Sequence, residues 1–314
     1  MAQTTWVSDA PSGVYKNHAM SMQIYQAAIE DTIGMMFVRV VDGSGRGRGE
    51  TVTLTRRSNL TQPTTGELLE TERIPEYPFS LTTTAVTLTE RGGSVPYTNL
   101  FEELSEFDVT SEIQMSLKDQ LALVIDTSIF TAFKTAQIKY APTGVASNNI
   151  STNGTFGGTA ASNMNVFHAE ELSAYLYDTL KAPYWEDESY IGIFRNKSLL
   201  GIRRDPAFEE WWKYTDPSVK LKGEVGTLEQ IKFIRTNHAA AFGNVGTASV
   251  LGEGVVFGKD AVAMAEALTP ELRAGIPTDA GRAKQLYWYG ILGFGLIWTT
   301  ANAGEARVMH VGSL

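Results

Sequence analysis

Residues 81–98 read LTTTAVTLTERGGSVPYT, a stretch rich in threonine and valine. These residue types favour a β-strand, because branched side chains fit a pleated surface. The strand nevertheless has little to bury, since Val86 and Leu88 are the large apolar residues of its central part and both lie on one side. We therefore expect a covering surface to come from elsewhere.

The antiparallel partner predicted for residues 84–91 is ETVTLTRR, residues 50–57, in which Val52 and Leu54 alternate with threonines. The connection between the two strands, residues 58–80, contains three prolines and has no sustained period. A structureless connection of this length is unusual inside a compact domain and is commonly functional. We predict a long two-stranded ribbon with a wide tip, which is marginally stable in water unless something covers it.

Gly92 and Gly93 are predicted to break the ribbon and to form a hinge. A helical pattern follows from about residue 100 to residue 137, with a break at Asp108. A four-residue apolar spacing drifts around a helix of 3.6 residues per turn, so the apolar stripe should meet more than one partner. The residues of this stripe are Ile113, Leu117, Leu121, Ile125, Ile129 and Phe133.

The remaining sequence mixes helices and strands without regular β–α–β alternation, which favours an α+β fold over a doubly wound one. Residues 141–165 are predicted to form a loop at a domain boundary. Helices are predicted at residues 22–34 and 167–181 and after Pro206. Strands are predicted at residues 35–41, 190–194, 229–236, 255–259, 285–299 and 306–311.

The composition of the chain excludes several classes of function. The 314 residues carry a formal net charge of -9, which argues against a protein whose main task is to neutralise nucleic-acid phosphates. Because the chain has no cysteine, disulfides, cysteine-ligated metals and cysteine nucleophiles are excluded. The most apolar run, residues 286–298, is too short to span a bilayer and is predicted to be a buried strand.

No catalytic, cofactor or metal site is predicted. The glycine-rich stretch at residues 43–49 is followed by a strand, so the helix N-terminus that would hold phosphate is missing. The stretch GEGVVFGKD at residues 252–260 lacks one glycine of a phosphate-binding loop and has Asp260 at the magnesium-binding position. The four histidines have no metal-ligand spacing, and WEDES at residues 185–189 is interpreted as a solvated turn.

The order of these elements resembles the major capsid proteins of tailed bacteriophages, which have the Hong Kong 97-like fold. The resemblance covers nearly the whole chain. The segments that carry it are ETVTLTRR at 50–57, LTTTAVTLTERGGSVPYTN at 81–99, FEELSEFDVTSEIQMSLKDQLALVIDTSIFTAF at 101–133, GEVGTLEQIKFIRT at 223–236 and VVFGKDAVAMAEA at 255–267.

The resemblance implies a division of the chain into an arm, a loop that lies across a neighbouring subunit, and two domains. It also implies that the surface covering residues 84–91 lies on another chain. The implied segments are an N-terminal arm (1–49), an extended β-ribbon loop (50–98), a peripheral domain with a long spine helix (99–140), an axial domain (141–250) and return strands to both domains (251–314).

The charged residues of the extended loop are the predicted contacts between subunits, as ion pairs that set register more than affinity. They are Arg56, Arg57, Glu67, Glu70, Glu72, Arg73 and Glu76, with Gly92 and Gly93 as the hinge. Some relatives form covalent crosslinks through a lysine on this loop. Residues 51–98 contain no lysine, so that chemistry is not expected here.

The implied function is that of a non-enzymatic shell subunit in the virion, assembled in the cytoplasm of a bacterial host. Its partners would be copies of itself in hexamers and pentamers, a separate scaffolding protein, a portal, in some systems a decoration protein, and enclosed double-stranded DNA bound without sequence specificity. No membrane partner and no cofactor are expected. Two alternatives remain at this stage: an encapsulin-like nanocompartment shell, and an α+β enzyme whose long loop is a lid.

Overall fold

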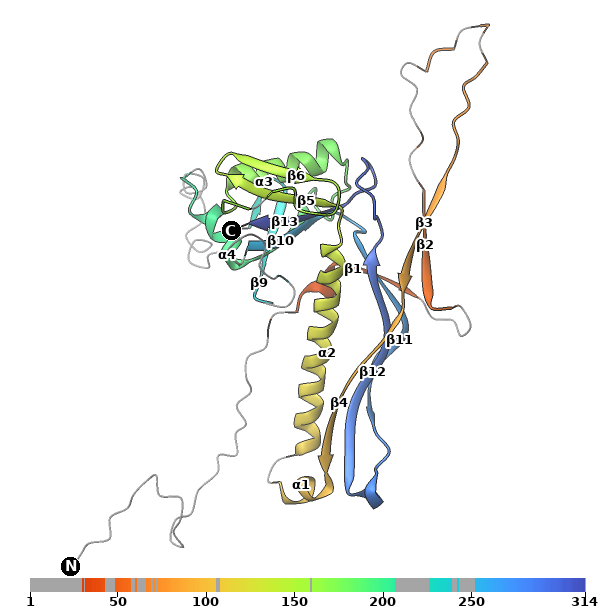
Figure 1. Cartoon of the computed structure of the whole chain (residues 1–314), viewed down its shortest axis with the longest axis vertical. Helices are drawn as coiled ribbons and strands as arrows, with labels where there is room; N and C mark the ends of the chain where they lie inside the picture. Colours follow the sequence, from red (N-terminus) through yellow and green to blue (C-terminus); the bar gives the residue numbers. More distant parts are fainter. Residues whose placement is uncertain are drawn as a thin grey trace, which may run out of the picture.

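Two β-sheets, a projecting two-stranded ribbon, one long helix and several shorter helices make up the part of the protein that the structure describes (Figure 1). The computed structural model describes residues 30, 32–42, 49–57, 60, 66–68, 70–71, 73–105, 108–158, 160–206, 226–238, 242 and 252–313. Several predicted features fall outside these residues. They are most of the N-terminal arm and its helix at 22–34, the glycine-rich stretch at 43–48, Glu72 and the helix after Pro206.

A four-stranded sheet packs beside the long helix α2 (Val109–Lys134) (Figure 1). Its strand order is β1-β11-β12-β4, with β1 parallel to β11 and the other pairs antiparallel. The 26 residues of α2 make it about 39 Å long, so the helix runs along much of the sheet. The strands are β1 (Val38–Asp42), β4 (Thr89–Thr98), β11 (Val262–Ala274) and β12 (Ala283–Leu296), and the short helix α1 (Asn99–Leu104) joins β4 to α2.

A seven-stranded sheet forms the second body, in the order β6-β5-β13-β10-β7-β9-β8. Two of its inner strands, β10 and β13, are buried along their whole length, as expected for strands covered on both faces. The strands are β5 (Ile138–Gly144), β6 (Ser147–Ser151), β7 (Tyr190–Arg195), β8 (Thr227–Leu228), β9 (Ile231–Thr236), β10 (Gly252–Phe257) and β13 (Val308–Ser313), and the helices are α3 (Val166–Ala174), the π-helical turn η2 (Tyr175–Thr179) and α4 (Asn196–Arg203).

The ribbon is the two-stranded sheet β2 (Thr51–Arg57) and β3 (Leu81–Thr87), which projects from the rest of the protein (Figure 1). The antiparallel pairing is confirmed, and its register runs from Thr51 opposite Thr87 to Arg57 opposite Leu81. The predicted strand at residues 84–91 is wrong in its end point, because the ribbon stops at Thr87 and a new strand begins at Thr89.

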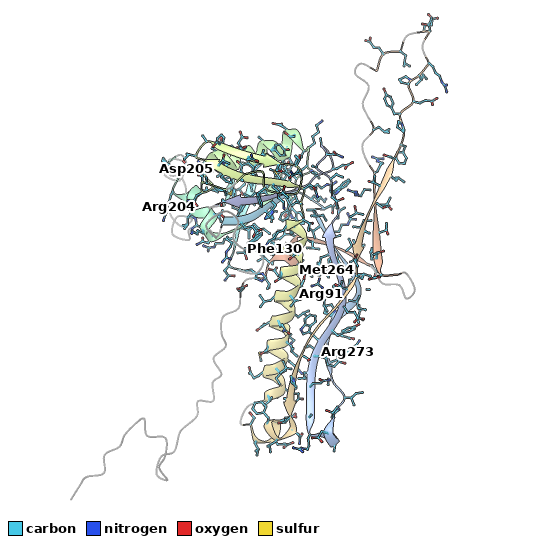
Figure 2. All side chains as sticks on the ribbon, in the orientation of Figure 1. Arg91, Phe130, Arg204, Asp205, Met264 and Arg273 are labelled. Carbon is cyan, nitrogen blue, oxygen red and sulfur yellow. The ribbon has the colours of Figure 1, made fainter. Side chains whose placement is uncertain are left out.

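The long helix has the predicted break and the predicted winding stripe. Asp108 is the N-cap of α2, and its carboxylate accepts a hydrogen bond from the Ser111 N–H at 3.3 Å. Near the start of α2, Leu117 packs with Leu286 and Trp288 of the four-stranded sheet. Near its end, Phe130 and Phe133 pack in a second cluster, against aromatic rings of the other body. Figure 2 labels Phe130 on α2 beside that body.

The predicted break at Gly92 and Gly93 is wrong. Strand β4 continues through both glycines, which lie opposite Tyr289 and Trp288 of β12. Residues 89–98 are therefore part of the four-stranded sheet rather than of the extended loop. The physical reason is close packing: a Cβ added at Gly93 would lie 2.3 Å from Gln120 Oε1 and 2.9 Å from Trp288 Nε1. The glycine allows α2 to approach the sheet.

Two further predictions are corrected. Residues 141–165 are not a loop throughout, because the hairpin of β5 and β6 occupies their first part. Strand β11, 13 residues long, had no counterpart among the predicted strands. Its sequence VAMAEALTPELRA is rich in alanine and glutamate, which do not favour strands, and its pairing with β1 and β12 overrides that local preference.

We expect Gly93→Ala to lower the free energy of unfolding by about 1–3 kcal/mol, the usual cost of inserting an atom into a packed site. The added methyl group would displace Gln120, whose Oε1 accepts a hydrogen bond from Trp288 Nε1 at 3.0 Å. Denaturant unfolding measures the change. Ser94→Ala, at the exposed neighbouring position, is the control and should change stability little, whereas equal effects of the two variants would contradict this packing role.

Candidate assembly surfaces

Among the residues that the structure describes, no three histidine, aspartate or glutamate side chains gather in a way that could hold a metal ion. No described helix is long and apolar enough to cross a membrane. The structural features that call for a functional explanation are two exposed apolar surfaces and three buried clusters of charge.

We call the root of the ribbon the part of β2 and β3 whose side chains contact β12 and the segment after it. This root is covered by its own chain. Val86 is 2 % exposed, and its side chain lies over Gly293 and Gly295 of β12, where a Cβ would meet it at 3.0 and 3.1 Å. Thr84 Oγ1 donates a hydrogen bond to the carbonyl of Ile297 at 3.2 Å. The expectation that the cover for residues 84–91 comes wholly from another chain is therefore wrong for the root.

The outer part of the ribbon and its loop have no such cover. Large apolar side chains are exposed along the described part of this segment, far more densely than scattered surface residues would be. They are Leu60, Leu68, Ile74, Tyr77, Phe79 and Leu81. We call this surface the loop face. Its apolar area is typical of a surface that another protein covers.

The predicted contact residues divide between the loop and the root. Arg73 Nη2 lies 2.5 Å from Glu76 Oε1, so this pair forms within the loop, with both side chains exposed. Glu67, Glu70 and Arg57 are exposed, and Glu72 lies outside the described residues. Arg56 differs from the others and is buried at the root.

A second exposed apolar surface lies at the opposite end of the molecule, where α1 and the β11–β12 turn meet (Figure 1). It consists of Leu100, Phe101 and Leu104 of α1 and Ile276. No exposed surface was predicted here, since the predicted apolar stripe of the helix begins only at Ile113. The signal was present, since three large apolar residues occur in a helix of only six residues.

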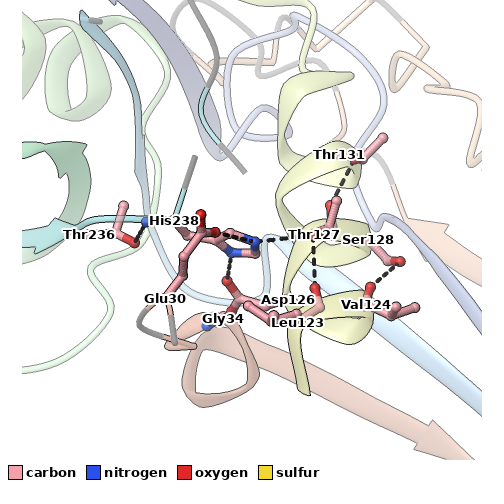
Figure 3. Close-up of polar contacts among 10 residues, drawn as sticks. All are labelled: Glu30, Gly34, Leu123, Val124, Asp126, Thr127, Ser128, Thr131, Thr236 and His238. Carbon is pink, nitrogen blue, oxygen red and sulfur yellow. Dashed lines mark hydrogen bonds and ion pairs between the residues drawn. The ribbon is translucent and has the colours of Figure 1, made fainter. Parts of the chain in front are cut away.

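A buried polar cluster joins the two bodies at the middle of α2 (Figure 3). His238 Nδ1 lies 2.5 Å from Asp126 Oδ2, and both side chains are almost fully buried. Asp126 Oδ1 accepts a hydrogen bond from the Gly34 N–H at 2.6 Å, and His238 Nε2 lies 3.3 Å from Glu30 Oε2. The cluster therefore ties the end of the N-terminal arm and the segment after β9 to α2.

A second buried cluster joins the end of α2 to the seven-stranded sheet. Lys139 Nζ donates to the carbonyl of Lys134 at 2.6 Å and lies 2.8 Å from His310 Nδ1. His310 Nε2 lies 2.6 Å from Glu253 Oε1, and Lys134 Nζ lies 3.2 Å from Glu253 Oε2. Burial lowers the pKa of Lys139 to about 8, although the nearby Glu253 opposes the shift. Burial also lowers the pKa of His310.

The lowered pKa of Lys139 predicts how stability depends on pH. Between about pH 8 and pH 10.5 the unfolded chain binds more protons at this lysine than the folded chain does. The free energy of unfolding should therefore rise with pH across this window, by on the order of 2–3 kcal/mol. Lys139→Met should lack that rise. Urea unfolding of both proteins across the window tests this, and equal pH slopes would contradict it.

Comparison with known proteins identifies the fold. No family model matches the sequence, and no curated protein matches it either. The structure is similar to the head structure of Helicobacter pylori bacteriophage KHP40, with a TM-score of 0.72, 14 % identity and coverage of 99 % of this chain and 98 % of that chain. It is similar to the cyanophage Pam1 capsid, with a TM-score of 0.71, 14 % identity and coverage of 100 % and 99 %.

A capsid from a native GTA particle is also similar, with a TM-score of 0.64, 14 % identity and coverage of 97 % of this chain and 98 % of that chain. The similarity thus extends over essentially the full length of each protein. The chain has the α+β, Hong Kong 97-like fold of bacteriophage capsids, as the sequence resemblance implied.

Proposed function

We propose that this chain is the major capsid protein of a tailed bacteriophage, a structural subunit that assembles into an icosahedral shell around double-stranded DNA. The observation that carries the proposal is the loop face, an apolar surface on a segment that projects away from its own chain (Figure 1). The full-length likeness to phage capsids supports it. The outer part of such a ribbon and its loop gain burial only when neighbours cover them.

The segments have distinct proposed roles. The extended loop lies across a neighbouring subunit, the seven-stranded body meets its copies at the centre of each hexamer and pentamer, and the N-terminal arm reaches adjacent subunits. Scaffolding and portal proteins assist assembly in the host cytoplasm, and a decoration protein is a further partner of such shells. The net charge of -9 is compatible with a shell wall that encloses DNA without binding it tightly.

The contents of native shells test this function. Shells recovered from the bacterium that naturally produces the chain should protect double-stranded DNA from added nuclease. Shells that hold a cargo enzyme and no protected DNA would instead support an encapsulin-like nanocompartment. A soluble monomer with enzymatic turnover would support the enzyme with a lid.

We expect mature shells to yield monomer-sized bands after boiling in detergent. Residues 51–98 contain no lysine, so the extended loop offers no amine for an isopeptide bond to a neighbour. Shell stability must then come from many modest non-covalent contacts repeated by symmetry. Denaturing gel electrophoresis is the measurement, and a ladder of higher bands would show that covalent links form elsewhere.

A further inference from the structure

Three side chains from distant parts of the sequence meet at the root of the ribbon. Arg56 comes from β2, Trp298 from the segment after β12, and Arg307 from the segment before β13. The guanidinium carbons of Arg56 and Arg307 lie 5.8 and 4.5 Å from the centre of the Trp298 ring. Two cations thus share one aromatic ring, an arrangement that costs charge repulsion.

Several hydrogen-bond donors of this cluster have no acceptor within the described residues. They are Arg56 Nε and Nη1, Trp298 Nε1 and Arg307 Nε. Arg56 is only 8 % exposed, so water does not replace the missing acceptors at its buried atoms. A guanidinium group stays charged and keeps five donors, and leaving such donors unsatisfied is costly. Contact between an N–H donor and an aromatic ring compensates only weakly for a missing hydrogen-bond acceptor.

The charges around the cluster are predominantly positive. Asp260 is the one acidic residue with a described ion pair here, and it is shared between Arg39 at 3.2 Å and Arg307 at 3.8 Å. Lys259 adds a further cation beside it, and its carbonyl accepts a hydrogen bond from Arg307 Nη1 at 2.9 Å. No described carboxylate contacts Arg56. Arg56 therefore lacks a described anion that its donors could bind, and Arg307 shares its one described carboxylate with Arg39.

We propose that Arg56, Trp298 and Arg307 form a receptor for a glutamate carboxylate from the extended loop of a second copy of this chain. This proposal rests on the proposed shell function and names the partner of its loop. A carboxylate can accept two hydrogen bonds from one guanidinium, which would satisfy the unpaired donors. Entry requires a small shift of the ribbon root, because the donors are buried in the isolated subunit.

Glu67 and Glu70 fit this partner. Both are exposed on the described part of the loop, and no described residue forms an ion pair with either. The loop extends away from the rest of its own chain (Figure 1), and its exposed glutamates Glu67 and Glu70 are therefore accessible to other molecules. A contact from the loop of one copy to the root of the next is heterologous, and repetition of such a contact closes a ring when the rotation between copies divides a full turn.

The first experiment compares the removal of two single cations. Arg56→Met retains an apolar chain over Trp298 but removes the charge, and Lys118→Met, which removes an exposed cation from α2, is the control. We expect the Arg56→Met monomer to melt no lower than wild type, because a buried unpaired charge is lost, while its assembled fraction falls at least about tenfold. Lys118→Met should assemble within about twofold of wild type.

The outcomes separate this inference from the proposed function. If wild-type protein forms no particles under any condition, the shell function itself fails. If wild-type and Arg56→Met proteins assemble equally well, only the receptor fails. A drop in the melting temperature of the Arg56→Met monomer, with normal assembly of what remains folded, would mean that Arg56 is merely structural.

The second experiment traps the contact. Because the chain has no cysteine, single cysteines can be placed without background. Thr82 lies opposite Arg56 on the same face of the ribbon, and Thr83 lies opposite Thr55 on the other face. Thr82→Cys combined with Thr71→Cys, which leaves Glu67 and Glu70 in place, should give disulfide-linked dimers and larger species in particles. Thr83→Cys combined with Thr71→Cys should give few. Equal crosslinking of the two pairs, or none for either, would overturn the proposal.

Discussion

Replacing residues 58–80 by Asn-Gly should leave a subunit that folds but does not assemble. Arg57 and Leu81 are a directly opposed pair in the ribbon, so a two-residue turn can join β2 to β3 without changing their register. The described ion pair of the deleted segment, Arg73 with Glu76, lies within the segment itself. Its removal therefore exposes no core, whereas it deletes most of the loop face.

Circular dichroism and thermal melting should show a subunit like wild type, and size-exclusion chromatography should show only small species. A matched control carries a Gly/Ser loop of equal length in place of residues 58–80. It should also fail to assemble, because chain length is restored while the apolar and charged side chains are not. Normal particles from either variant would show that the loop is not an assembly element.

Asp126→Ala should lower the free energy of unfolding by about 3–5 kcal/mol, the usual cost of breaking a buried pair by removing one partner. His238 would lose its carboxylate partner at 2.5 Å, and the Gly34 N–H would lose the acceptor at 2.6 Å (Figure 3). Both groups are held in the interior, so water cannot fully replace the lost contacts. Urea unfolding measures the effect.

Two further variants give reference values for the loss of stability caused by Asp126→Ala. Asp126→Asn keeps an oxygen that can accept from Gly34 but loses the charge beside His238, so its loss of stability should be smaller. Thr131→Ala, one turn further along α2, removes an exposed hydroxyl that donates to the Thr127 carbonyl, and should change stability by less than about 0.5 kcal/mol. If Asp126→Ala were as mild as Thr131→Ala, the cluster would not be what joins the arm and the two bodies.

Local patterns predicted the parts of the fold that depend on local preference. The alternation of Val52 and Leu54 with threonines indicated β2, and Asp108 marked the start of the long helix. The four-residue spacing on α2 predicted more than one packing partner, and Leu117 and Phe133 of that stripe indeed belong to different clusters. In each case the residue's own chemistry or periodicity determines the structure.

Features set by packing between distant segments could not be predicted in this way. Gly92 and Gly93 resemble a turn locally, yet the approach of α2 to β4 is what requires a residue without a side chain at position 93. His238 and Asp126 lie 112 residues apart and belong to no motif. Arg56 looked like the other loop charges, and only the position of Trp298 distinguishes it.

The measurement that tests the central claim most directly is electron microscopy of the purified chain in negative stain, with and without a co-expressed scaffolding protein. We expect closed particles of uniform diameter or their ring-shaped capsomers, because the loop face and the α1 surface are exposed in the isolated subunit and require neighbours. A field of dispersed monomers under both conditions, from protein that is folded by circular dichroism, would contradict the shell function.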